Sequence, residues 1–194
     1  MRLPTLEKDF WTQTQQAHPA DVRSRTRLMD GVSRREESHP VDFELIPHVG
    51  AGPLRFGMSR SDVRSTLHRL GFPLSHENET LDYFCENSIR TEYTDGSLSF
   101  IEFSCDQHFL PLYRGTDVFS LTAEELFAAI AKGESGGPHA YDPLEYVFPE
   151  QIIALWAADA QYDHRTKHTR VVWGAVGVGD ARYLAAVKAL ANDI

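Results

Sequence analysis

The side chains with the most potential for catalysis are a thiol and an imidazole that lie three positions apart. Cys105 and His108 could form a nucleophilic pair in which the imidazole stabilises the thiolate. Such a pair must be aligned in space, and proximity in the sequence does not establish that alignment. The chain contains neither a Cys-x-x-Cys nor a His-Glu-x-x-His motif. The sequence therefore predicts no catalytic residue.

The metal- and phosphate-binding patterns are weak. His164 and His168 have the i, i+4 spacing of a helical metal site, but they lie between two strand patterns and enclose an Arg and a Lys that would repel a cation. An exposed hairpin tip is the favoured interpretation. A phosphate loop leads directly into a helix, whereas a short extended run follows Gly50-Ala51-Gly52. The glycines of 174–179 follow the last strand and are expected to be structural. We expect no metal and no cofactor.

The net charge of −9 is concentrated in one part of the chain. Residues 1–40 contain seven Lys and Arg against six Asp and Glu, whereas residues 41–194 contain twelve against twenty-two, a net of −10. An acidic protein repels polyanions, so a nucleic acid partner is not expected. The same charge suits solubility, and it also suits a basic protein partner.

The cysteines and the apolar runs indicate the cellular compartment in which we expect the protein. Cys85 and Cys105 are too few for a disulfide framework or a zinc site. We expect buried free thiols in a reducing compartment, although the two could face each other across neighbouring strands. The first residues lack the apolar stretch of a signal peptide, and no apolar run approaches the ~20 residues that span a membrane. These features predict a cytoplasmic protein without a membrane segment.

Three segments have the pattern of helices. Ser59 is a good N-cap, and Asp62 places a carboxylate at the positive end of the helix that follows. Thr122 caps the second helix, and Glu125 completes a capping box. A third helix is predicted from Asp180, because apolar side chains then recur at helical spacing.

Short alternating or apolar runs predict the strands. They cover 42–46, 54–56, 81–85, 89–93, 98–103, 112–114, 118–119, 146–148, 152–157 and 169–176. The parity of apolar positions changes between Phe100 and Ile101, which predicts a bulge or a strand buried on both faces. The element order predicts an α+β fold in which a helix plus an antiparallel β-meander occurs twice, with helices packed on one face of the sheet and a C-terminal helix.

Composition divides the chain into three parts. Residues 1–40 are expected to form a charged arm, partly helical or flexible, whose apolar segment from Leu3 to Trp11 could dock on the body or on a partner. Residues 41–109 and 110–194 are the two predicted β-α-β-meander units, which we expect to form a single compact domain.

Many aromatic side chains fall on or beside the predicted strands. They could fill the core, or they could leave one sheet face available to a partner. In the second case an acidic sheet face binds a basic protein, and the predicted partner-binding residues are Glu92, Glu102, Tyr113, Trp156 and Trp173. The alternative is a small-molecule or enzymatic site at the seam between the two halves, built from Cys105, His108, Tyr113 and Trp156.

The segment from Gly52 to Val63, Gly-Pro-Leu-Arg-Phe-Gly-Met-Ser-Arg-Ser-Asp-Val, resembles a helix start found in small bacterial α/β-meander proteins. There, Gly-Met-Ser/Thr is followed by two residues, an acidic residue and Val. The segment is similar to that of small outer-membrane-assembly lipoproteins, of the tandem-repeat β-lactamase-inhibitory protein and of immunity proteins encoded beside polymorphic toxins. A lipobox cysteine is missing, so the lipoprotein role is not implied. The resemblance implies an immunity-like inhibitor. Together with the net charge of −10 on residues 41–194, the tandem element order and the absence of a predicted catalytic residue, it predicts a non-enzymatic inhibitor of a basic bacterial toxin or enzyme.

Overall fold

A computed structural model describes residues 39–163 and 167–192. Within these ranges the elements are β1 (Val41–Ile46), β2 (Gly50–Ala51), β3 (Leu54–Arg55), α2 (Arg60–Arg69), β4 (Leu74–Glu77), β5 (Leu81–Phe84), β6 (Ile89–Thr94), β7 (Ser97–Ser104), β8 (Phe109–Tyr113), β9 (Thr116–Asp117), the 3-10 helix η1 (Val118–Ser120), α3 (Ala123–Ala131), β10 (Glu145–Phe148), β11 (Ile153–Asp163), β12 (His168–Gly179) and α4 (Ala181–Asn192). The fold is α+β with a C-terminal helix, as the sequence predicts.

No helix in the described ranges is long and apolar enough to cross a membrane. The predicted arm of residues 1–40 lies almost entirely outside these ranges.

The predicted helix starts are present. The Ser59 side chain accepts a hydrogen bond from the backbone amide of Asp62 at the start of α2. Thr122 and Glu125 form the reciprocal capping box at the start of α3. Asp180 accepts two backbone amides in the first turn of α4. Each cap satisfies amides that a helix leaves without an intrahelical partner, which is why these helices begin where they do.

The strands form two sheets, one of five strands in the order β3-β2-β1-β8-β9 and one of seven in the order β10-β11-β12-β7-β6-β5-β4. Most neighbouring strands are antiparallel, but β1 and β8 run parallel, with Val41 opposite Phe109. β7 pairs with β12 in the large sheet. Strands from both predicted units are therefore hydrogen-bonded to each other in both sheets.

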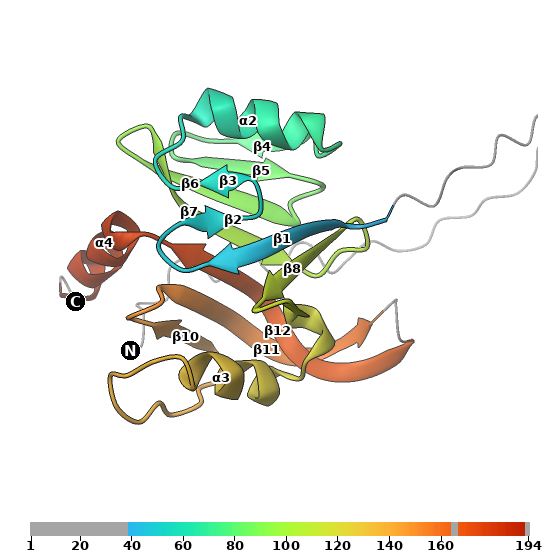
Figure 1. The fold of residues 1–194 in the computed structure, drawn as a ribbon, viewed down its shortest axis with the longest axis vertical. Helices are drawn as coiled ribbons and strands as arrows, with labels where there is room; N and C mark the ends of the chain where they lie inside the picture. The colour runs from blue at the N-terminus through green and yellow to red at the C-terminus, as the bar shows by residue number, and fades with distance from the viewer. Residues whose placement is uncertain (1–38, 164–166, 193–194) are drawn as a thin grey trace, which may run out of the picture.

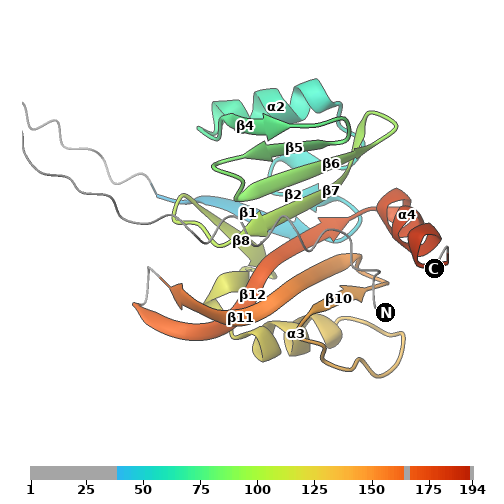
Figure 2. The ribbon, with the colours of Figure 1, turned by 180° about the vertical axis from the view of Figure 1, so that it is seen from behind.

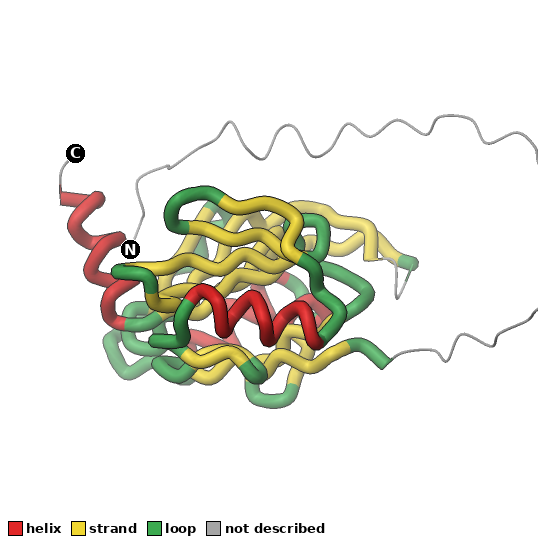
Figure 3. The backbone as a smooth tube through the Cα atoms, turned by 90° about the horizontal axis from the view of Figure 1, so that it is seen from above, coloured by secondary structure: helices red, strands yellow, loops and turns green. Residues whose placement is uncertain are grey.

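The seven-stranded sheet has two faces that are covered differently. Its inner face packs against α2, α3 and the five-stranded sheet, and Phe43, Leu67 and Phe103 belong to the core between them (Figure 1). Figure 2 views the opposite, outer face, with the five-stranded sheet behind it. From the pairing registers, the outer face carries Leu81, Tyr83, Arg90, Glu92, Phe100, Glu102, Glu145, Val147, Ala154 and Trp156. α4 covers one end of this face, at the edge of the molecule (Figure 3).

A buried ion cluster holds α2 to the large sheet. Arg60 and Arg64 donate to Asp82 on β5 at 2.6 and 2.7 Å, and the Asp82 side chain is 0% exposed. The Tyr93 hydroxyl donates to the same carboxylate at 3.1 Å. Burial by itself raises the pKa of Asp82, but the hydrogen bonds and charges of the two arginines outweigh burial and hold this pKa below its usual value.

Several elements differ from the sequence-based prediction, among them the short strands β2 and β9, which were not predicted. β4 was not predicted, because its four residues are all exposed and leave no alternating pattern. Residues 118–119, predicted as extended, belong to η1, whose first turn is capped by Asp117. β11 and β12 remain paired as far as Asp163 and His168, so the hairpin tip is shorter than predicted.

β7 contains a bulge, but it lies at Ser99 and not between Phe100 and Ile101 as predicted. The register shifts between Glu92 and Tyr93, which face Phe100 and Leu98, so Ser99 is an extra residue on β7. β7 is also buried along both faces.

Candidate functional site

Five side chains gather on the outer face where β6, β7 and β11 cross it, and we call them the outer-face cluster: Arg90, Glu92, Phe100, Glu102 and Trp156. Arg90 stands opposite Glu102, and Glu92 stands opposite Phe100, across the β6–β7 ladder. The Trp156 ring meets the Phe100 ring edge to face, with 5.6 Å between centroids. The cluster thus combines two carboxylates, one guanidinium and two aromatic rings.

The Arg90 guanidinium lies at the centre of this cluster. It donates to Glu102 at 2.8 Å, and its Cζ lies 5.8 Å from the Phe100 centroid and 6.0 Å from that of Trp156. These distances are those of cation–π contacts. The Nε of Arg90 is buried and has no hydrogen-bond partner in the part of the chain that the structure describes.

The two carboxylates share this single cation. Glu102 is 6% exposed, and Glu92 is half-buried, with a carboxylate that accepts no hydrogen bond from any described residue. Burial raises the pKa of Glu92, and the charge of Arg90 offsets only part of this effect. Burial also raises the pKa of Glu102; Arg90 opposes this shift and Glu92 adds to it. The outer-face cluster therefore carries one more negative than positive charge when both acids are ionised.

Local sequence explains why these side chains share a face. β6 alternates between buried residues and the half-buried Arg90 and Glu92, as a strand with one face on the core does. On β12, Gly177 leaves room for the Phe100 ring, because a Cβ at Gly177 would lie 2.2 Å from it. Tyr183 of α4 stacks on the same ring, with 4.1 Å between centroids.

Three of the five predicted partner-binding residues, Glu92, Glu102 and Trp156, meet in this cluster. Trp173 does not join them, because it is 1% exposed and its indole N–H donates to a backbone carbonyl of α3 at 2.9 Å. The left-handed backbone of Ala157, with a φ of 51°, interrupts the regular alternation of β11 beside Trp173. A sequence pattern cannot reveal such a kink.

Tyr113 also lies in the core. It is 5% exposed, and its hydroxyl donates to Gln151 at 2.5 Å. The four residues of the alternative seam site consequently occupy different surroundings: Tyr113 in the core, Trp156 on the outer face, and Cys105 and His108 in the loop between β7 and β8.

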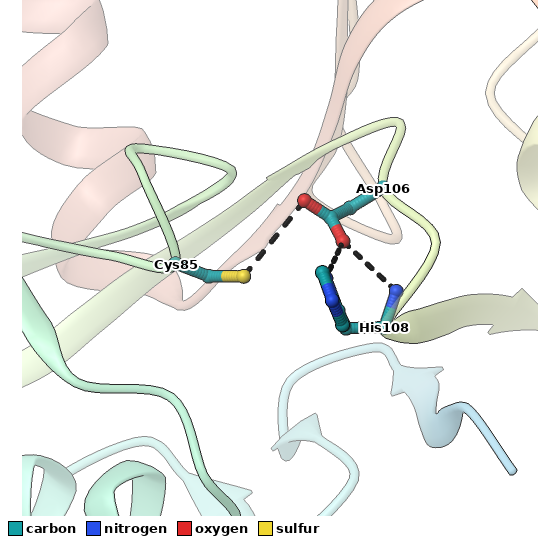
Figure 4. Close-up of side chains that lie close together, drawn as sticks. All are labelled: Cys85, Asp106 and His108. Atoms are coloured by element: carbon teal, nitrogen blue, oxygen red, sulfur yellow. Dashed lines mark hydrogen bonds and ion pairs between the residues drawn. The ribbon is translucent and has the colours of Figure 1, made fainter. Parts of the chain in front are cut away.

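A second group, which we call the Cys85 cluster, consists of Cys85, Asp106 and His108 (Figure 4). The His108 Nδ1 lies 2.7 Å from Asp106 Oδ1, and the Cys85 thiol donates to Asp106 Oδ2 at 3.8 Å. The imidazole of His108 is thus engaged by a carboxylate, and the thiol that joins it is Cys85, whereas Cys105 is exposed. Neither thiol forms a disulfide, and the expectation that Cys105 is buried was wrong.

The Cys85 cluster is poorly suited to nucleophilic catalysis. Burial and the neighbouring Asp106 raise the pKa of the Cys85 thiol to about 11, so the thiol stays protonated near neutral pH. The three side chains nevertheless offer a sulfur, an oxygen and a nitrogen ligand, all within 4.8 Å of one another. Such a set could hold a metal ion. The number of cysteines does not reveal this group of ligands, because only one of the three is a thiol.

The sequence also contains the Gly-x-Ser-x-Gly spacing of a nucleophile elbow at 133–137. An elbow requires a strand before the serine and a helix after it. Here the segment follows α3 and leads into a loop, and the Ser135 hydroxyl donates to Glu150 at 2.8 Å. The structure gives Ser135 a loop-anchoring role.

The remaining motifs are structural. Gly50 has a φ of 145° and a Cβ there would lie 2.0 Å from the Leu54 carbonyl oxygen, so this glycine serves the tight β2–β3 turn. The glycines of 174–179 lie within β12. His168 begins β12, and its predicted companion His164 lies outside the described residues.

Comparison with models of protein families finds no match to this chain. Searches among curated proteins and among solved structures likewise find no match. The resemblance of the segment from Gly52 to Val63 therefore stays a hypothesis.

Proposed function

We propose that this chain is a non-enzymatic protein-binding module, an immunity-like inhibitor that binds a basic bacterial toxin or enzyme through the outer face of its large sheet. Within this proposal Glu92 and Trp156 are the contact residues, and the buried Glu102 holds Arg90 beside them. Tyr113 and Trp173 support the fold from the core.

The observation that carries the proposal is the half-buried carboxylate of Glu92. Burial raises its pKa, and no described residue donates a hydrogen bond to it. Keeping an ionised carboxylate in such a place costs stability, and a neutral side chain would avoid that cost. An Arg or Lys of a partner would supply the missing charge and donors.

The rest of the cluster fits the same kind of partner. Trp156 is half-buried, and aromatic residues of this kind are enriched among interface hot spots. Arg90 already lies against Phe100 and Trp156, so the face accommodates a guanidinium next to aromatic rings. The net charge of −10 on residues 41–194 would also accelerate association with a basic protein.

The experiment measures binding to the protein products of neighbouring reading frames, each produced in an inactive form. We expect one basic product to bind, with an affinity that falls as salt is added. Glu92→Gln keeps the shape of the side chain and removes its charge, and we expect it to weaken binding by about tenfold or more. Co-expression with the active partner should then protect cells with the wild-type chain and fail with the variant.

Asp42→Asn is the matched control. Asp42 is exposed on β1 in the five-stranded sheet, away from the outer face, and its substitution changes the net charge by the same amount. Binding by this variant should stay within about twofold of wild type, since surface charges contribute little. Equal weakening by the two variants would overturn the assignment to the outer face, and a partner that binds without any salt dependence would contradict the charge argument.

A further inference from the structure

The Cys85 cluster shares no residue with the outer-face cluster and brings together three kinds of metal ligand. We propose that Cys85, Asp106 and His108 form a Zn²⁺ site between the β5–β6 turn and the β7–β8 loop. The inference does not depend on the proposed partner binding.

The ligand types favour zinc. Thiolate, imidazole and carboxylate are the groups that bind Zn²⁺ in proteins, whereas Mg²⁺ and Ca²⁺ prefer oxygen ligands throughout. A site with three protein ligands leaves a fourth position open, which water or a group of a partner can fill.

The distances fit a tetrahedral ion after small adjustments. Zinc bonds of ~2.0–2.3 Å place neighbouring ligand atoms about 3.3–3.7 Å apart. The Cys85 Sγ to Asp106 Oδ2 distance is 3.8 Å, and the Asp106 Oδ1 to His108 Nδ1 distance is 2.7 Å. Binding therefore requires the imidazole to exchange its hydrogen bond with Asp106 for a bond to the metal. The His108 side chain is 59% exposed, so it has room to turn.

Other hydrogen bonds already orient the carboxylate. The Ser88 hydroxyl donates to Asp106 Oδ2 at 2.9 Å, and the backbone amide of His108 donates to Oδ1 at 2.9 Å. Hydrogen bonds of this kind hold metal-binding carboxylates in position. By contrast, the Cys85 thiol is a weak hydrogen-bond donor and lies 3.8 Å from Asp106 Oδ2. This weak hydrogen bond does not explain why the thiol points toward the carboxylate, whereas a shared metal ion would.

The place of the site in the fold suggests what the ion does. The carbonyl of His108 accepts the backbone amide of Val41 at 3.0 Å, where the parallel β1–β8 pair begins. A zinc ion would tie the β5–β6 turn to the β7–β8 loop, directly before β8 pairs with β1. When it binds, the thiol releases its proton to solvent and the sulfur electron pair forms the bond to zinc.

The test uses the full chain after removal of metal by a chelator. Co²⁺ is added as a spectroscopic probe, and Zn²⁺ then competes with it. We expect one Co²⁺ per chain, a sulfur-to-cobalt charge-transfer band, and displacement of that band by Zn²⁺. Cys85→Ser should abolish the band and weaken Zn²⁺ binding at least about tenfold, since even residues that only support metal ligands contribute that much.

Cys105→Ser is the matched control, because it removes the other thiol of the chain, and it should keep both the band and the affinity. His108→Ala tests the imidazole at an exposed position, where folding is not at risk, and should weaken binding similarly. Circular dichroism verifies that each variant is folded. Absence of stoichiometric Co²⁺ binding would overturn the proposal, as would a band that disappears in Cys105→Ser and persists in Cys85→Ser.

Discussion

Replacing Asp82 by Asn should destabilise the fold strongly, because this carboxylate is the shared anion of a buried cluster. Asp82 is 0% exposed and accepts hydrogen bonds from Arg60, Arg64 and Tyr93. An asparagine at this position removes the charge and turns an N–H₂ group toward guanidinium groups that are themselves donors.

The expected loss is about 3 kcal/mol in the free energy of unfolding. Breaking a buried ion pair by removing one partner typically costs about 3–5 kcal/mol. The lower end of this range applies here. The side chains of Arg60 and Arg64 are 26% and 34% exposed, so water partly solvates their charges when the carboxylate is lost. Arg60 also keeps its hydrogen bonds to the carbonyls of Asn78, Glu79 and Leu81.

Glu77→Gln is a matched comparison, because Glu77 also forms an ion pair with Arg64. Its side chain is 53% exposed, and exposed ion pairs contribute about 0–1 kcal/mol. Urea unfolding followed by circular dichroism measures both variants. With a slope of about 2–3 kcal/mol/M, Asp82→Asn should lower the midpoint by about 1 M or more.

The pH dependence provides a second test of the same reasoning. The pKa of Asp82 is lower in the folded protein than in the unfolded chain, so its stabilising contribution is present above the unfolded value of about 3.9 and is lost as the pH falls through the folded value. The stability difference between wild type and Asp82→Asn should thus be constant from pH 8 to about 5 and shrink below about 4. A loss under ~1 kcal/mol at neutral pH, or a difference that does not change in acid, would refute the reasoning.

Substitutions at three further positions test a helix cap and the packing, each by urea unfolding. Thr122→Ala removes the N-cap that pairs with Glu125 and should cost about 1 kcal/mol, and Thr122→Ser should restore it. Gly177→Ala places a Cβ 2.2 Å from the Phe100 ring and should cost about 1–3 kcal/mol; an unchanged midpoint would mean that the ring moves freely. Trp173→Phe leaves a buried carbonyl of α3 without its indole donor and should cost about 1–3 kcal/mol, whereas no loss would contradict that hydrogen bond.

Much of the fold could be predicted from the sequence because its signals are local. Ser59, Thr122 and Asp180 cap the helices at the predicted places. The alternation along β6 likewise predicted an outward-facing Glu92. These features depend on residues within a few positions of one another.

Other features depend on contacts between distant segments. Asp82 lies 22 positions from Arg60, and Cys85 lies 21 positions from Asp106, so sequence proximity pointed to Cys105 instead. The burial of Trp173 beside the kink at Ala157 follows from the path of a long strand and its packing against α3.

The most direct test of the central claim is to measure partner binding and stability together for Glu92→Gln. Because burial raises the pKa of Glu92 above its unfolded value, ionisation of this acid opposes folding at neutral pH. The neutral variant should therefore be at least as stable as wild type and should bind the basic partner about tenfold or more weakly, whereas Asp42→Asn binds normally. A Glu92→Gln variant that loses stability while binding normally would contradict the account, since Glu92 would then serve the fold and not a partner.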